Sequence, residues 1–122
     1  MNQKNIFSVI SLILLLQGIF FYLMGAKVVG EAFSGLDENG VNAGAKLMEV
    51  LSATSILVGL ITYASRECPQ VVWAYVLGFA LFLCISLKHL LSDNIHVPIG
   101  AIAVQGLILI SCGYLLMQQN KD

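Results

Sequence analysis

The chain has 122 residues, of which 58% are hydrophobic and only 11% are charged, with a formal net charge of −1 and a mean hydropathy of +0.88. A soluble domain usually carries about 25% charged residues, so this composition excludes a water-coated globule and indicates an integral membrane protein. Lysine and arginine are scattered singly, which also excludes a basic face for nucleic acid.

Four predominantly apolar runs are long enough to cross a bilayer as helices, which takes about 20 residues each. They cover approximately residues 6–24, 47–65, 71–91 and 97–117. The first run, "IFSVISLILLLQGIFFYLM", is longer than the apolar core of a signal peptide (roughly 7–15 residues) and is followed by no A-x-A pattern. We therefore expect four transmembrane helices in a single all-α membrane domain.

The connections between these runs differ in length and composition. Residues 26–46 are rich in Gly, Asp and Asn, which favour turns, so we expect a polar extramembrane loop whose first part extends the helix or lies at the interface. The connections at 66–70 ("RECPQ") and 92–96 are short, which favours antiparallel neighbours. The predicted architecture is an up-down-up-down four-helix bundle.

Small residues recur at helical intervals and predict where helices approach one another closely. Such contacts join the helices of one bundle or of two copies, and the sequence leaves both open. The predicted packing positions are Ser11, Gly18 and Gly25 in the first span, Ser55 and Gly59 in the second, and Gly106 and Gly113 in the fourth.

Ionisable groups inside a span are costly and are functional hypotheses by default. Glu49 lies early in the second span, and Lys88 and His89 lie late in the third. The topology places Glu49 and Lys88 toward the same membrane face, where they form a candidate ion pair or ligand site. His89 points about 100° away from Lys88. The alternative is that Lys88 extends to the headgroups and that Glu49 interacts with its helix dipole.

Other polar groups in the spans can be explained by helix packing as well as by function. Gln17 and Gln105 are expected to hydrogen-bond across helices. The hydroxyl-rich second span, with Ser52, Thr54 and Thr62, indicates packing or a polar conduit. The cysteines have no metal or redox spacing, and no motif supplies a nucleophile and its base, so no catalytic residue, metal or cofactor is predicted.

The layout resembles one family of small bacterial membrane proteins. "ISLILLLQGIFFYLMG" is followed by a Gly/Asp-rich segment, by a small-residue-rich second span ending at "YASR", and by two further spans. Over nearly its whole length this pattern resembles the four-helix proteins grouped as DoxX-like. The resemblance lies in the layout of the spans and transfers no functional residue. Some DoxX-like proteins are associated with quinone-linked redox enzymes, so the resemblance also implies a lipophilic ligand as an alternative.

The predicted location is a multi-pass position in the cell membrane, most simply a bacterial inner membrane. The positive-inside rule ties between the two faces, and the N-terminal amine tips the expectation toward both termini in the cytoplasm. The leading hypothesis is a non-enzymatic packing or interaction subunit, with the lipid bilayer, a second copy or another membrane protein as partner. The alternatives are a binder of a quinone- or lipid-like molecule beside Glu49 and Lys88, and a small channel or transporter.

Overall fold

The computed structural model describes residues 2–91 and 98–120, and the regular structure in these residues is entirely helical. The elements are α1 (Gln3–Ala32), α2 (Glu38–Ala64), the short 3-10 helix η1 (Pro69–Val71), α3 (Val72–Leu90) and α4 (Ile99–Gln119). By length and composition, each of the four α-helices can cross a bilayer. The all-α prediction is confirmed for this part of the chain, while the predicted connection 92–96 and the first residue of the fourth span, Val97, lie outside the described residues.

Most of the segment 26–46, which was expected to be a polar loop whose first part extends the helix or lies at the interface, is helical. α1 continues to Ala32 and α2 begins at Glu38, so only residues 33–37 join them. The Asp37 side chain caps α2 by accepting a hydrogen bond from the Gly40 amide at 2.8 Å. The glycines of this segment were interpreted as turn residues because glycine tolerates tight turns, but pairing of α1 with α2 outweighs their weak helix propensity.

The first hairpin, formed by α1 and α2, is held by close backbone approach. A Cβ atom at Gly18 would lie 2.9 Å from the Ser52 carbonyl oxygen, and one at Gly25 would lie 2.9 Å from Met48 Cβ. Near the loop, a Cβ atom at Gly44 would lie 2.5 Å from Val29 Cγ1. Lipid gives two apolar helices no hydrophobic reason to associate, so small residues that permit this approach supply van der Waals contact instead.

Three serine hydroxyls add hydrogen bonds across the same contact. Ser11 Oγ donates to the Gly59 carbonyl at 2.7 Å, and Ser52 Oγ donates to the Gly18 carbonyl at 2.6 Å. Ser55 Oγ donates to the Leu14 carbonyl at 2.9 Å. These bonds satisfy hydroxyl groups that have no water to bond in a membrane interior, and they set the register of α1 against α2.

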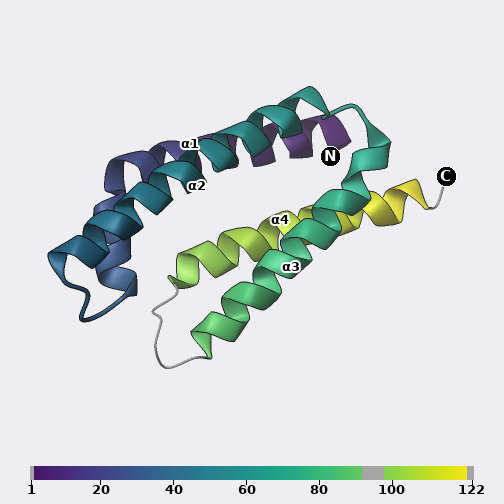
Figure 1. Cartoon of the computed structure of the whole chain (residues 1–122). Coiled ribbons are helices and arrows are strands. Elements are labelled where there is room, and N and C mark those ends of the chain that lie inside the picture. The colour runs from purple at the N-terminus through teal and green to yellow at the C-terminus, as the bar shows by residue number, and fades with distance from the viewer. Residues whose placement is uncertain (1, 92–97, 121–122) are drawn as a thin grey trace.

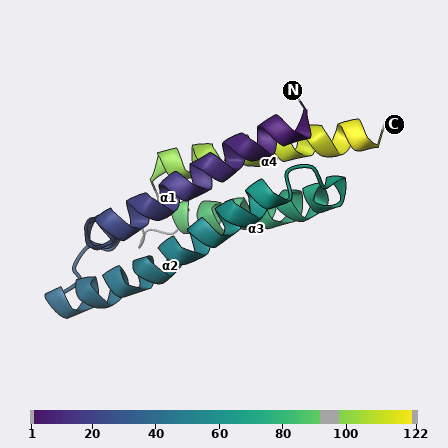
Figure 2. The ribbon, with the colours of Figure 1, turned by 90° about the horizontal axis from the view of Figure 1, so that it is seen from above.

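The second hairpin, formed by α3 and α4, meets the first one at the end that carries both termini (Figures 1 and 2). Phe7, which is fully buried, contacts Tyr75 of α3 with ring centroids 4.9 Å apart, and Thr62 of α2 shares a 2.6 Å hydrogen bond with the Tyr75 hydroxyl. The buried cluster at this junction comprises Ile6, Phe7, Ile10 and Leu14 of α1, Val72 of α3, and Ile108, Cys112 and Leu115 of α4.

Away from this junction the two hairpins separate (Figure 1). The buried residues of α4 are Ile108, next to its middle, and Cys112 and Leu115 in its second half. Val72 at the start of α3 is that helix's only buried residue. The arrangement therefore has the predicted four-helix layout, but its packing is closed only at the end where the termini lie. We call that region the closed end and the opposite region the open end.

Candidate functional site

The structure does not bring Glu49 and Lys88 together. The ion pairs between described residues join Lys4 to Glu67 and Lys27 to Glu31, and neither involves Glu49 or Lys88. Both of these side chains are exposed, and His89 is half-buried. Lys88 and His89 lie in the last turn of α3, at the open end, where the hairpins have separated.

Helix rotation also keeps Glu49 away from α3. Thr62 marks the face of α2 that contacts Tyr75 of α3, and Glu49 is 13 positions earlier on the same helix. At about 100° per residue, the two side chains point roughly 140° apart. The two hairpins can therefore approach each other without placing Glu49 opposite Lys88.

Glu49 instead lies at a groove on the outer side of the first hairpin. The groove has a volume of about 310 Å³ and is lined by Ile19, Tyr22 and Leu23 of α1 and by Glu49, Ser52, Ala53 and Ile56 of α2. The small side chains of Ser52 and Ala53 leave the space between larger neighbours. The Ser52 hydroxyl is already bonded to the Gly18 carbonyl, so Glu49 is the charged group that the groove presents.

The two predicted intramembrane amides have different surroundings. Gln105 of α4 accepts a hydrogen bond from Ser86 Oγ of α3 at 2.9 Å, which ties the second hairpin together. Gln17 of α1 is half-buried, and its side chain takes part in none of the hydrogen bonds between described residues.

The hydroxyl groups of α2 point to separate neighbours. Ser52 and Ser55 bond carbonyls of α1, Thr54 bonds the Val50 carbonyl of its own helix at 2.9 Å, and Thr62 contacts Tyr75. A conduit needs polar groups that follow one another along a continuous path. These contacts place the hydroxyls in helix packing.

The predicted small-residue positions divide between the two hairpins. Ser11, Gly18, Gly25, Ser55 and Gly59 all lie at the contact between α1 and α2. By contrast, a Cβ atom added at Gly106 or Gly113 of α4 would meet no described atom within 4 Å. These two glycines therefore form no close helix contact within the described part of the chain.

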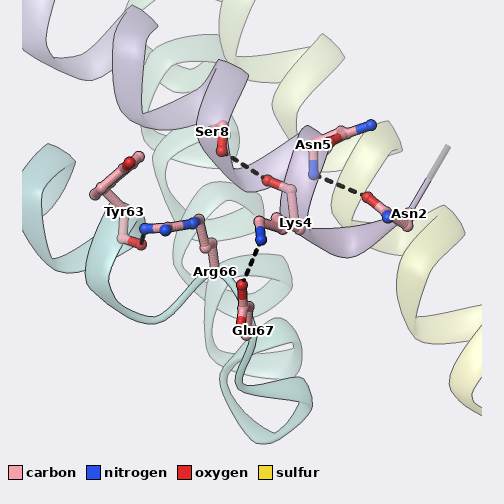
Figure 3. A network of polar contacts seen from close by, with 7 residues as sticks. All are labelled: Asn2, Lys4, Asn5, Ser8, Tyr63, Arg66 and Glu67. Carbon is pink, nitrogen blue, oxygen red and sulfur yellow. Dashed lines mark hydrogen bonds and ion pairs between the residues drawn. The ribbon is translucent and has the colours of Figure 1, made fainter.

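A polar network at the closed end was not singled out from the sequence (Figure 3). Lys4 Nζ lies 2.8 Å from Glu67 Oε1, and Gln3 Nε2 donates to the Cys68 carbonyl at 2.8 Å. Arg66 lies over the Tyr63 ring, 3.9 Å from its centroid. The sequence did carry a signal for the ion pair, since Lys4 precedes the first span and Glu67 follows the second. Antiparallel pairing of these two spans places the start of one beside the end of the other.

The ion pair between Lys4 and Glu67 predicts a pH dependence. A hydrogen bond from Lys4 and its positive charge hold the pKa of Glu67 below its ordinary value of 4.5, with a smaller contribution from Arg66. A carboxyl group with a lowered folded-state pKa contributes its stability above the ordinary value and loses it as the pH falls through the lowered one. We expect Lys4→Gln to return the pKa of Glu67 toward 4.5, as measured by NMR titration of the carboxyl carbon. Lys27→Gln is the matched control and should leave that titration unchanged.

Among residues 2–91 and 98–120, no group of three or more His, Cys, Asp or Glu side chains is placed to hold a metal ion. Cys68 and Cys84 are exposed and Cys112 is buried, and all three are free thiols. Comparison of the chain with models of known protein families, with curated proteins and with solved structures finds no significant match. The resemblance to DoxX-like proteins therefore stays a prediction.

Proposed function

We propose that this chain is a four-span integral membrane protein of the cell membrane that acts without catalysis, by packing its second hairpin against another membrane-embedded helix. The partner is a second copy or a different membrane protein. Both termini then lie on one side of the bilayer, and we assign that side to the cytoplasm. A DoxX-like relationship is part of this proposal because it rests on the same four-span layout.

The contrast between the glycines of the two hairpins supports this role. Gly18, Gly25 and Gly59 are each within 3.4 Å of a neighbouring helix when a Cβ atom is added, whereas Gly78, Gly106 and Gly113 have nothing within 4 Å among the described residues. Glycine in a membrane helix permits close approach by another helix. The first hairpin uses Gly18, Gly25 and Gly59 for its own contact, although Gly30 of α1 is as uncovered as the glycines of the second hairpin. The glycines of the second hairpin are therefore left for contact with a helix outside the chain.

The low burial of α3 also supports contact of the second hairpin with a helix outside the chain. Of the most apolar 18 residues in the span Pro69–Leu90, which contains α3, only 6% are buried inside the chain, compared with 33% for the corresponding residues of α1. Leu77 and Leu81 of α3 and Leu107 of α4 are each more than 60% exposed. In a bilayer these side chains contact either lipid or a partner, and a partner accounts for the neighbouring glycines as well.

Site-directed photo-cross-linking in native membranes tests this proposal. A benzophenone amino acid at Leu77 or Leu107 should give adducts with a partner protein, and the same group at Leu23 or Leu60 on the first hairpin serves as the matched exposed control. Adducts from the second hairpin alone support the proposal. Recovery of only the 13.2 kDa monomer from all four positions would contradict it.

A second candidate function is favoured by the groove beside Glu49. Its volume of about 310 Å³ falls at the low end of the range for small-molecule sites, about 300–1,000 Å³, and its walls are mainly apolar. A lipophilic ligand was expected between the second and third spans, beside Glu49 and Lys88, whereas this groove lies between α1 and α2 and Lys88 does not line it. Binding of a membrane-dissolved molecule is compatible with the packing role, because the groove and the second hairpin occupy different faces.

A further inference from the structure

We propose that the groove beside Glu49 binds the amine end of an amphiphile dissolved in the membrane, with the alkyl part of the molecule lying along Ile19 and Ile56. This inference rests on the membrane assignment of the proposed function and adds a ligand class to its second candidate. The class follows from the depth of the carboxylate, from the groove's direction, and from the hydrogen-bonding character of the groups that line it.

The position of Glu49 along the helices sets the polar end of the ligand. Gly25 lies opposite Met48, and Val29 lies opposite Gly44, so Lys27 of α1 and Lys46 of α2 are at nearly the same level. Lysines at the ends of apolar spans mark the headgroup region. Glu49 lies three residues further into α2 than Lys46, or about 4.5 Å along the axis, so its carboxylate lies at the boundary of the apolar layer.

The groove extends from that carboxylate toward the middle of the membrane. Ile56 lies seven residues beyond Glu49 on α2, about 10 Å deeper at 1.5 Å per residue. Ile19 of α1 lines the groove together with it. A polar group at the shallow end and apolar walls over the deeper part match a molecule with one polar end and an alkyl chain.

The chemistry of the lining groups selects an amine. A carboxylate only accepts hydrogen bonds, so Glu49 binds an ammonium or another donor. Tyr22 also lines the groove and its hydroxyl can donate or accept, so the preference for an amine rests on the charge of Glu49. None of the ion pairs between described residues engages Glu49. The Ser52 hydroxyl is 2.6 Å from the Gly18 carbonyl and is therefore committed to packing. An ammonium group gives the Glu49 carboxylate an opposite charge where water is scarce, which strengthens the attraction.

Photolabelling of the full chain in phosphatidylcholine vesicles tests this inference. The probe is a twelve-carbon alkylamine carrying a diazirine, and peptide mass spectrometry locates the labels. We expect labels concentrated at residues 19–23 and 53–56, with labelling reduced about fivefold in Glu49→Gln, a loss of the size that a partly exposed ion pair supports. Glu38→Gln changes an exposed acid of the same helix outside the groove and should leave the labelling unchanged. The uncharged alcohol with the same chain should label wild type as weakly as the amine labels Glu49→Gln.

Ala53→Leu provides a second variant because it fills the groove and keeps the carboxylate. It should also reduce labelling, and circular dichroism checks that both variants keep the helical content of the wild type. Equal labelling of wild type and Glu49→Gln, or labels spread evenly over all lipid-facing positions, would overturn the inference. Competition by added phosphatidylethanolamine would identify a lipid headgroup as the source of the amine, and competition by free alkylamine alone would identify a non-lipid amine. Either result supports the proposed ligand class.

Alkaline carbonate treatment of the same vesicles separates the two proposals. Protein that is extracted from the vesicles would contradict the membrane assignment itself. Protein that resists extraction but takes up no label through Glu49 would contradict only the amine site, and would leave the packing role in place.

Discussion

Replacing Gly18 by alanine is expected to lower the free energy of unfolding by about 2 kcal/mol, which lies within the usual cost of overpacking a close contact. The added Cβ atom would lie 2.5 Å from Ile56 Cγ1, 2.9 Å from the Ser52 carbonyl oxygen and 3.2 Å from the Ile56 amide nitrogen. Two of these atoms belong to the backbone of α2, so a side-chain rotation cannot relieve the overlap. The helices must move apart, which also weakens the hydrogen bond from Ser52 to Gly18.

Gly106→Ala is the matched control for this change in the isolated monomer, where no partner helix covers α4. A Cβ atom at Gly106 meets nothing within 4 Å among the described residues, and alanine is favoured over glycine inside a helix by about 1 kcal/mol. We therefore expect opposite signs for the two substitutions, as measured by denaturing the protein with sodium dodecyl sulfate in mixed micelles and following circular dichroism. Equal effects would mean that the contact between α1 and α2 is looser than the structure has it.

Phe7→Ala is expected to cost about 3 kcal/mol, since truncating a buried phenylalanine removes packing contacts and leaves a cavity. Phe7 is 0% exposed and contacts Tyr75 of the second hairpin. Burial in this cluster removes the side chain from lipid, which is itself apolar, so we take the low end of the range found for cores in water. The loss should separate the hairpins while leaving the contact of α1 with α2 largely intact.

Two measurements distinguish this outcome from general unfolding. The distance between spin labels at Lys27 and Lys46, exposed positions at nearly the same level of the first hairpin, should be the same with and without Phe7. The fluorescence of Trp73, at the start of α3, should change. Phe20→Ala is the control, because Phe20 is 50% exposed and its aromatic neighbour is Phe21 of the same helix. Similar losses for Phe7→Ala and Phe20→Ala would contradict the assignment of the closed end as the junction.

Hydropathy was sufficient to predict the four helices, because their apolar windows are long and carry few charges. It left the extension of α1 to Ala32 as one of two alternatives, and it did not predict the extension of α2 back to Glu38. These added helical turns contain Gly, Asn and charged residues, which have low hydropathy or weak helix propensity. The contact of Val29 with Gly44 holds them helical. Helix pairing stabilises this segment, and local composition does not record that pairing.

The sequence left open whether Glu49 and Lys88 meet, because it supplies only part of the geometry of the candidate site. Counting residues from a short connection gives the level of each side chain along its helix. It does not give the rotation of the helix about its axis or the angle between two hairpins. Thr62 faces α3 and Glu49 faces the groove, and this difference depends on which small residues fix the contact between α1 and α2. Ser11, Gly18 and Gly25 indicated that contact in the sequence, but their partners on α2 were not predictable.

The two helical hairpins are joined at the closed end and separate toward the open end. Spin-label distances in lipid vesicles test this arrangement most directly, using a background in which the three native cysteines are replaced by alanine. One label pair at Ala64 and Trp73 reports on the closed end. A second pair at Lys46 of α2 and at Leu91, the C-cap of α3, reports on the open end, each residue being 18 positions from its closed-end counterpart. Because 18 residues make five turns, both pairs face in matched directions. We predict a clearly longer distance for Lys46 and Leu91 than for Ala64 and Trp73. Equal distances would contradict this arrangement, because neighbouring helices in a closed bundle stay about 8–10 Å apart along their whole length.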